Sequence, residues 1–192
     1  MHTARLFLAI DLNEQVIARL AGIQGVLEGL YRGARWVKPE GMHVTLKFFG
    51  KLPLREVYEI SNGIKGVAGR HEAFRCDISG IGGFPSLGRP RVLWAGVGAN
   101  SELVQQVGME VLAEMEARGY GAEERQFVPH ITLARFKDRR EYDEGNVETL
   151  LPRYDRYEFG STEIERLVLY SSELTPAGPV YTRVDSWELG RA

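Results

Sequence analysis

A four-residue motif, His-x-Thr-Leu, occurs twice in this chain of 192 residues, at His43–Leu46 and again at His130–Leu133. The second position is β-branched in both copies. Alternate residues of a β-strand point to opposite faces, so the His and the Thr of each copy share one face and the two apolar residues share the other. The copies begin at positions 43 and 130, 87 residues apart. This spacing favours two related halves, each presenting a His and a Thr to one common cleft.

The pattern of apolar residues predicts an α+β chain. Helical spacing predicts helices at about residues 13–31, 53–67 and 101–118. Shorter apolar runs predict strands at 3–10, 42–49, 73–78, 91–97, 127–136, 154–159, 161–171 and 180–189, and the charged segment 137–148 is expected to be partly helical. We expect one bilobal domain over residues 1–192. Two largely antiparallel sheets would flank a central cleft, with helices on the outer faces and a pseudo-two-fold relation between the halves.

Composition limits the binding partners and the cellular location that we expect for this chain. The formal net charge is −2, which argues against binding long nucleic acid through bulk electrostatics and leaves a small nucleotide or an RNA end. Cys76 is the only cysteine, so an internal disulfide framework is excluded and a small buried residue is expected. No apolar run reaches the ~20 residues of a membrane helix, and the N-terminus lacks a signal-peptide pattern. We therefore expect a cytoplasmic monomer without a membrane partner.

Two histidines facing one cleft suit general acid–base catalysis. An imidazole titrates near neutral pH, so one ring can accept a proton from a nucleophile while the other donates a proton to a leaving group. In-line displacement at phosphorus fits this symmetry, because the attacking and leaving oxygens lie on opposite sides of the phosphorus atom. The two Thr hydroxyls would then hydrogen-bond the non-bridging oxygens. The alternative is that each His and Thr is simply a satisfied polar residue on a half-buried strand.

Further candidates lie close to the motifs. Arg135 could bind phosphate, but strict alternation would point it away from the face of His130, so it needs a β-bulge or a strand end; otherwise it is an ordinary surface residue. Several aromatic residues could stack on a base, although most Phe residues in strands belong to the core: Phe7, Phe48, Phe49 and Phe84. Three cationic residues could add positive charge at the rim: Lys47, Arg89 and Arg91.

Other chemistries have weaker support in the sequence. The residue two positions after each motif His is Thr, a poor zinc ligand, and no nearby Cys or His completes a set of metal ligands. There is no Gly-x-Ser-x-Gly nucleophile motif, and Cys76 has no obvious base near it in sequence. The phosphate-binding loop Gly-x-x-x-x-Gly-Lys-Ser/Thr is also absent. Metal dependence, nucleophilic catalysis and nucleoside triphosphate hydrolysis are therefore not expected.

The residues around both motifs are distinctive. Trp36–Gly50 and Phe127–Arg135 contain the two copies, and the second reads Phe-x-Pro-His-x-Thr-Leu-x-Arg; Arg5–Ile10, Pro90–Val97 and Leu169–Leu174 extend the likeness along the chain. These segments resemble the 2H phosphoesterase superfamily. Within it, they are most similar to the bacterial and archaeal RNA 2′,3′-cyclic phosphodiesterases, historically called 2′-5′ RNA ligases.

The resemblance implies both a reaction and roles for the residues. The reaction is the hydrolysis of a terminal ribose 2′,3′-cyclic phosphate to a 2′-phosphomonoester, without a metal or another cofactor. His130 would accept a proton from water, and His43 would donate a proton to O3′. Three residues would hold the phosphate: Thr45, Thr132 and Arg135. Phe48 falls among the positions near the base. The substrates implied are RNA 3′ ends or small 2′,3′-cyclic nucleotides.

Two alternatives share the same groove. The site could join a 2′,3′-cyclic phosphate end to a 5′-hydroxyl end through a 2′-5′ linkage, with a hydroxyl in place of water. It could also bind RNA ends or nucleotides without catalysis, although binding alone would not require two proton carriers.

Overall fold

The local sequence sets the starts and ends of most elements. The computed structural model describes residues 2–29, 31, 33–87, 90–122, 126–137, 151–176 and 178–190. In chain order the elements are β1 (Thr3–Asp11), α1 (Glu14–Glu28), β2 (Arg35–Trp36), the 3₁₀ turn η1 (Pro39–Gly41), β3 (His43–Pro53), α2 (Glu56–Ala68), β4 (Phe74–Phe84), β5 (Val92–Val97), α3 (Ser101–Ala117), β6 (His130–Arg135), the 3₁₀ turn η2 (Leu151–Tyr154), β7 (Glu158–Ile164), β8 (Arg166–Thr175) and β9 (Gly178–Glu188). Asn13 caps α1, because its side chain accepts the N–H of Val16 at 2.9 Å.

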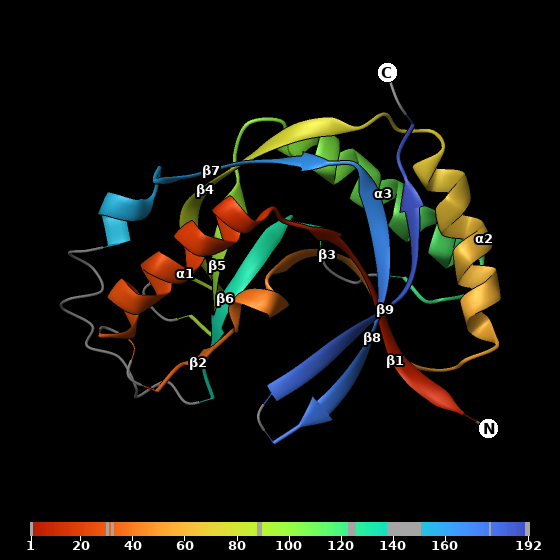
Figure 1. Cartoon of the computed structure of the whole chain (residues 1–192), viewed down its shortest axis with the longest axis horizontal. Coiled ribbons are helices and arrows are strands. Elements are labelled where there is room, and N and C mark those ends of the chain that lie inside the picture. The colour runs from red at the N-terminus through yellow and green to blue at the C-terminus, as the bar shows by residue number, and fades with distance from the viewer. Residues whose placement is uncertain are drawn as a thin grey trace.

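The described strands form one curled antiparallel sheet in the order β7-β4-β5-β6-β3-β1-β8-β9, with β2 paired to β6 (Figure 1). Between β3 and β6 the only paired residues in the described part are Val44 and Ile131. The sheet therefore divides at this pair into a four-stranded part, β3-β1-β8-β9, and a second part of β7-β4-β5-β6 with the short β2. The predicted α+β class with antiparallel pairing is confirmed, with the difference that the two predicted sheets are continuous through this one pair.

The two halves repeat the same order of elements. β1-α1-β3 in the first half corresponds to β5-α3-β6 in the second, and β1 pairs with β3 as β5 pairs with β6. Helix α1 contacts β7 in the second half, and α3 contacts β3 in the first (Figure 1). The helix of each half, α1 or α3, therefore packs against a strand of the other half. No helix in the described ranges has the length and apolar character needed to span a membrane.

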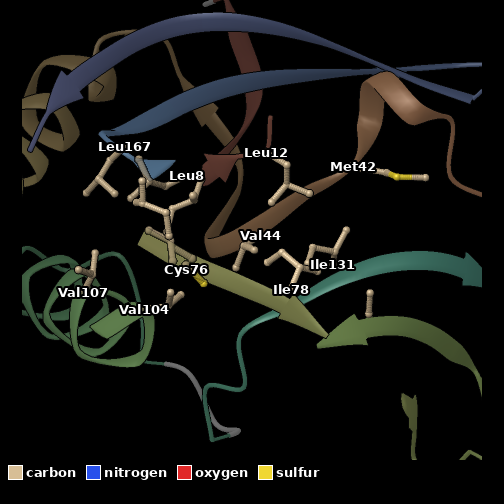
Figure 2. Close-up of a cluster of buried hydrophobic side chains, with 14 of the residues drawn as sticks. Leu8, Leu12, Met42, Val44, Cys76, Ile78, Val104, Val107, Ile131 and Leu167 are labelled. Carbon is tan, nitrogen blue, oxygen red and sulfur yellow. The ribbon is translucent and has the colours of Figure 1, made fainter. Parts of the chain in front are cut away.

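The apolar positions of both motifs lie in the core. Val44, Leu46, Ile131 and Leu133 are each at most 3% exposed, and Figure 2 shows Val44 and Ile131 side by side near Ile78 and Leu12. The alternation predicted for the motifs is therefore observed. Cys76 is buried in the same cluster, as expected, and burial raises the pKa of its thiol to about 12. Truncating a residue in such a core typically costs about 2–5 kcal/mol.

Several predicted boundaries are wrong, and glycine explains two of them. Strand β3 continues through Gly50 to Pro53, and β4 continues through Gly80 to Phe84. Both glycines have positive φ, 73° and 75°, and both lie at shifts of strand register. A glycine at a β-bulge bends a strand without ending it, so the strands continue beyond their predicted ends at residues 49 and 78.

Other corrections concern short elements. The predicted strand 161–171 is two strands, β7 and β8, which are separated at Glu165. The predicted strand 154–159 begins instead as η2, with β7 starting at Glu158. The segment 33–41, for which no helix or strand is predicted, contains β2 and η1, and β2 pairs with the end of β6. The partly helical segment predicted at 137–148 lies outside the described residues, apart from residue 137.

Candidate active site

The two motif strands meet where the halves of the molecule join. Val44 of β3 pairs with Ile131 of β6 in an antiparallel ladder. Because the ladder is antiparallel, His43 lies beside Thr132 and His130 lies beside Thr45, all on the face opposite the Val44–Ile131 pair. The two histidines are diagonal neighbours, for which a separation of about 7–8 Å is typical, with the Cβ atoms somewhat closer. This spacing leaves room for one small group between the rings.

The ring of His130 is held by a backbone carbonyl two residues earlier and by neighbouring aromatic rings. Its Nδ1 donates a hydrogen bond to the carbonyl of Val128 at 2.7 Å, since a carbonyl only accepts. This tautomer leaves Nε2 as the free, basic nitrogen. The Phe84 ring meets the imidazole edge-on with centroids 5.1 Å apart, and Trp94 lies at 6.2 Å. Burial lowers the pKa of His130, the Val128 carbonyl raises it, and the charge of Arg135 lowers it further.

His43 has a matching arrangement in the other half. Its ring stacks on Phe7 with centroids 4.8 Å apart, and Tyr181 meets it edge-on at 5.5 Å. Burial lowers the pKa of His43 to about 4, against the opposing effects of a hydrogen bond with the Gly41 backbone and the charge of Asp11. Arg135 and His130 lower this pKa as well. In each half, the residue two positions before the His, Gly41 or Val128, supplies the backbone hydrogen-bond partner of the ring. The pKa of His43 in the first half is also affected by the charges of the second half.

Among the described residues, a carboxylate lies opposite His43 but not opposite His130. Asp11 is the cross-strand partner of His43, and its carboxylate accepts hydrogen bonds from the Tyr170 hydroxyl at 2.8 Å and from Arg183 Nη2 at 3.3 Å. Burial and Asp11 raise the pKa of Tyr170 to about 12, so this hydroxyl remains a donor. The partner of His130 at the equivalent position is Gly96. Alternation along β1 from Phe7 places Asp11 on the face of the site, although the sequence pattern alone did not mark it as a site residue.

A β-bulge decides the direction of Arg135. Between Leu93 and Trp94 of β5, the register of β6 shifts by one residue and leaves Leu133 without a partner in β5. The extra residue reverses the alternation, so that Arg135 returns to the face of His130. Arg135 lines the same cavity as His130. The β-bulge that Arg135 needs in order to face the site is therefore present in β6.

Gln24 of α1 secures this bulge, a role that the sequence alone did not reveal. Its Nε2 donates to the carbonyl of Leu133 at 3.0 Å and to that of Val37 at 2.8 Å. The N–H of Val37 also donates to the Leu133 carbonyl at 2.9 Å. Gln24 is only 8% exposed, which is unusual for its residue type. A buried polar residue on an apolar helix face is the signal that would have found it.

The first motif contains the same bulge but a different side chain. Between Leu8 and Ala9 of β1, the register of β3 shifts and leaves Leu46 without a partner in β1. Phe48 therefore occupies the position in the first half that Arg135 occupies in the second. Phe48 is 59% exposed and lines the cavity. The two ends of the site thus differ, one being aromatic and the other cationic.

A cavity of about 760 Å³ connects these residues. This volume is in the usual range of small-ligand sites. Besides Phe48 and Arg135, the lining includes Thr45, Thr132, His130, Phe84, Pro85, Arg91, Leu112, Gln126, Phe127 and Val128. His43 is not among the lining residues and adjoins the cavity through its neighbour Thr132. In the described ranges, no three His, Cys, Asp or Glu side chains gather as a metal site would require.

Some of the predicted rim residues have other positions. Lys47 is 3% exposed, and its Nζ donates to the Gly121 carbonyl at 2.9 Å. Lys47 lines the cavity, but its ammonium group anchors a buried turn, which corrects the expected rim position; the bulge turns the side chain inward with that of Leu46. Phe7 stacks on His43, and Phe49 packs against Tyr120, so Phe48 and Phe84 remain the candidates for stacking. Arg91 is exposed at the cavity, and Arg89 lies outside the described residues.

Comparison with known proteins agrees with the duplicated architecture. The chain matches the LigT-like phosphoesterase family twice, over residues 10–94 and 97–181. The matches begin 87 residues apart, at 10 and 97, which is also the separation of His43 and His130. Each match therefore contains one motif at the same place.

Relatives and solved structures cover nearly the whole chain. An RNA 2′,3′-cyclic phosphodiesterase of Methanothermobacter thermautotrophicus is 35% identical over 185 residues, which cover 96% of this chain and 98% of the relative. A crystal structure of a Thermus thermophilus protein is 33% identical with a TM-score of 0.77, covering 96% of this chain and 97% of that chain. Escherichia coli LigT complexed with 3′-AMP has the same fold, with a TM-score of 0.77, 23% identity and coverage of 99% and 100%. This chain belongs to the LigT-like phosphoesterase family.

Proposed function

We propose that this protein hydrolyses the 2′,3′-cyclic phosphate at an RNA end to a 2′-phosphomonoester, without a metal ion. One observation carries the proposal: the antiparallel pairing at Val44 and Ile131 brings two His-Thr pairs to one face, beside a cavity that Arg135 lines. The relatives named RNA 2′,3′-cyclic phosphodiesterase support this choice of reaction.

The proposed reaction is an in-line displacement. Nε2 of His130 takes a proton from water, the water oxygen forms a bond to phosphorus, and the bond from phosphorus to O3′ breaks. His43 donates a proton to the departing O3′, which leaves a 3′-hydroxyl and a 2′-phosphate. The hydroxyls of Thr45 and Thr132, with the Arg135 guanidinium, bind the non-bridging oxygens. Donors placed before the reaction begins stabilise the charge that develops there.

The environment of Asp11 supports His43 as the acid. In the free protein the pKa of His43 is lowered to about 4 and that of His130 is also lowered, so both rings are neutral at pH 7. A bound phosphate anion raises the pKa of both rings, because it favours their charged forms. Asp11 adds to this effect at His43 only. Although burial lowers the pKa of His43 to about 4, Asp11 favours the charged form of this ring and has no counterpart opposite His130, so we assign His43 as the acid and neutral His130 as the base.

The whole chain is needed for this site. Each half supplies one His and one Thr, and each half covers the other with its helix, so we propose that residues 1–192 act as a single domain. The cytoplasmic location and the monomeric state stay predictions from the sequence.

The decisive assay is turnover of a nucleoside 2′,3′-cyclic phosphate in the presence of EDTA, with the product identified by chromatography. We expect turnover to the 2′-phosphate. A general acid or base contributes about 10²- to 10⁴-fold, so His43→Ala and His130→Ala should each lose activity on that scale. His2→Ala, at an exposed position in the N-terminal segment, is the matched control. Loss of turnover on chelation, or full activity of either motif variant, contradicts the mechanism. Tight binding of a 2′-phosphonucleotide without turnover indicates a binding protein instead.

A further inference from the structure

Three arginines gather at the end of β6. In the pairing of β2 with β6, Arg35 lies directly opposite Arg135. On the other side of β6, Val92 lies opposite Arg135, and Arg91 precedes Val92. The Arg91 carbonyl also accepts the N–H of Phe136 at 3.0 Å. The three arginines therefore belong to the adjacent strands β2 and β6 and to the residue before β5; Figure 1 shows these strands.

This arginine cluster, Arg35, Arg91 and Arg135, extends outward from the cavity. Arg91 and Arg135 line the cavity, and all three residues are exposed. Residues directly opposite each other on two strands share a face, so Arg35 lies on the face of Arg135. Arg35 is not among the lining residues. It therefore lies at the rim, one strand beyond Arg135.

The charges of the cluster are not balanced by the described part of the protein. No carboxylate among the described residues forms an ion pair with any of the three arginines. Like charges directly opposite each other on two strands disfavour folding. The chain as a whole carries a net charge of −2, so the cluster does not reflect a general excess of positive charge. An arrangement of this kind suits an anion with more than one charged group.

The proposed reaction accounts for only one arginine of the cluster. A cyclic phosphate has a single negative charge, which Thr45, Thr132 and Arg135 already hold in that mechanism. Arg35 and Arg91 remain. The next negative group along an RNA chain is the phosphodiester on the 5′ side of the terminal nucleotide.

We infer that Arg35 and Arg91 bind backbone phosphate upstream of the terminal nucleotide, so that the site selects an RNA chain end over a cyclic mononucleotide. This inference rests on the proposed function, since it takes the terminal phosphate to be held at Arg135. Arginine suits the role because its planar group binds phosphate oxygens in a bidentate manner.

The test compares two substrates that differ by one nucleotide. Steady-state kinetics are measured on adenosine 2′,3′-cyclic phosphate and on the dinucleotide ApA with a terminal 2′,3′-cyclic phosphate. For the variant with Arg35→Gln and Arg91→Gln, we expect kcat/KM on the dinucleotide to fall at least about tenfold through KM. Turnover of the mononucleotide should stay within about twofold. The dependence of dinucleotide KM on salt should also weaken.

The protein contains a matched control for the change of charge. Arg5 and Lys51 also face each other, across β1 and β3, at the opposite end of β3 from His43, and neither lines the cavity. Arg5→Gln with Lys51→Gln removes the same two charges and should leave the preference for the dinucleotide unchanged. The variant Arg35→Lys with Arg91→Lys keeps the charge but loses the bidentate geometry, so it should keep more of that preference than the glutamine variant and less than the wild type.

Binding distinguishes failure of the inference from failure of the proposed function. Affinities for the 2′-phosphorylated dinucleotide and mononucleotide are measured in parallel, together with thermal unfolding of each variant. If the wild type turns over neither substrate, the proposed function fails, and tighter dinucleotide binding that depends on Arg35 and Arg91 still supports the inference. Equal affinity for both ligands, or equal losses on both in the glutamine variant, overturns it.

Discussion

The two halves of this molecule share a backbone and differ in the chemistry that they present. Each half places a His and a Thr on a strand with a bulge at the motif Leu, and each His has a backbone partner two residues earlier. The side chains beyond the bulge differ, however, being Phe48 in one half and Arg135 in the other. Duplication alone would give a symmetric site. The difference between Phe48 and Arg135 makes the two ends of the site unlike, with one end suited to a nucleotide base and the other to phosphate.

The partners of the histidines differ in the same way. Asp11 stands opposite His43, whereas Gly96 stands opposite His130. A Cβ atom at Gly96 would lie 2.8 Å from the Ser79 carbonyl oxygen, so the second half has no room for a side chain there. The backbone of the second half therefore excludes a carboxylate at this position. On the proposed mechanism, the packing of the two halves therefore distinguishes the acid from the base.

The largest difference between the halves should appear when Arg135 is removed. We expect Arg135→Gln to lower kcat by about 10²- to 10³-fold, because a placed donor to the developing charge is lost. Thermal stability should change little, since the side chain is exposed. Arg166→Gln, a partly exposed arginine on β8 outside the cavity, is the control. A kcat within threefold of wild type would show that Arg135 does not contact the reacting phosphate.

Phe48, at the equivalent position, should affect binding more than chemistry. Stacking on an aromatic ring is worth about 1–3 kcal/mol per base, so Phe48→Ala should raise KM by about five- to a hundredfold. The value of kcat should stay close to wild type, in contrast to Arg135→Gln. Phe48→Tyr keeps the ring and serves as the control. If Phe48→Ala lowers kcat and leaves KM unchanged, the base does not stack there.

The smallest effect should come from Asp11, and it should appear in the pH profile. Asp11 raises the pKa of His43, whereas burial, Arg135 and His130 lower it; Tyr170 and Arg183 contact the carboxylate. Asp11→Asn should therefore lower the pKa of the acid, and the decline of kcat on the alkaline side should move to lower pH by up to about one unit. Tyr170→Phe keeps the carboxylate and should move this limb less. An unchanged alkaline limb would argue against His43 as the acid.

The sequence predicted those features that depend on local alternation. The faces of the two motifs, the burial of their apolar residues and the three helices follow from spacing along a single strand or helix. The bulges at Leu46 and Leu133 could not be predicted, because register is a property of two strands together. Asp11 and Gln24 were missed for a related reason: their roles depend on partners at His43 and Leu133, far away in the chain. The strands that contain Gly50 and Gly80 were predicted too short, because the local sequence does not distinguish a glycine that ends a strand from a glycine at a bulge.

The most direct measurement is a crystal structure with a nucleoside vanadate, whose five-coordinate centre resembles phosphorus during displacement. The account predicts that the vanadium atom lies between the two imidazoles, with the leaving O3′ toward His43 and the opposite apical oxygen toward Nε2 of His130. Both Thr hydroxyls and Arg135 should contact the equatorial oxygens. Vanadate bound away from either ring, or both rings on one side of it, would contradict the account.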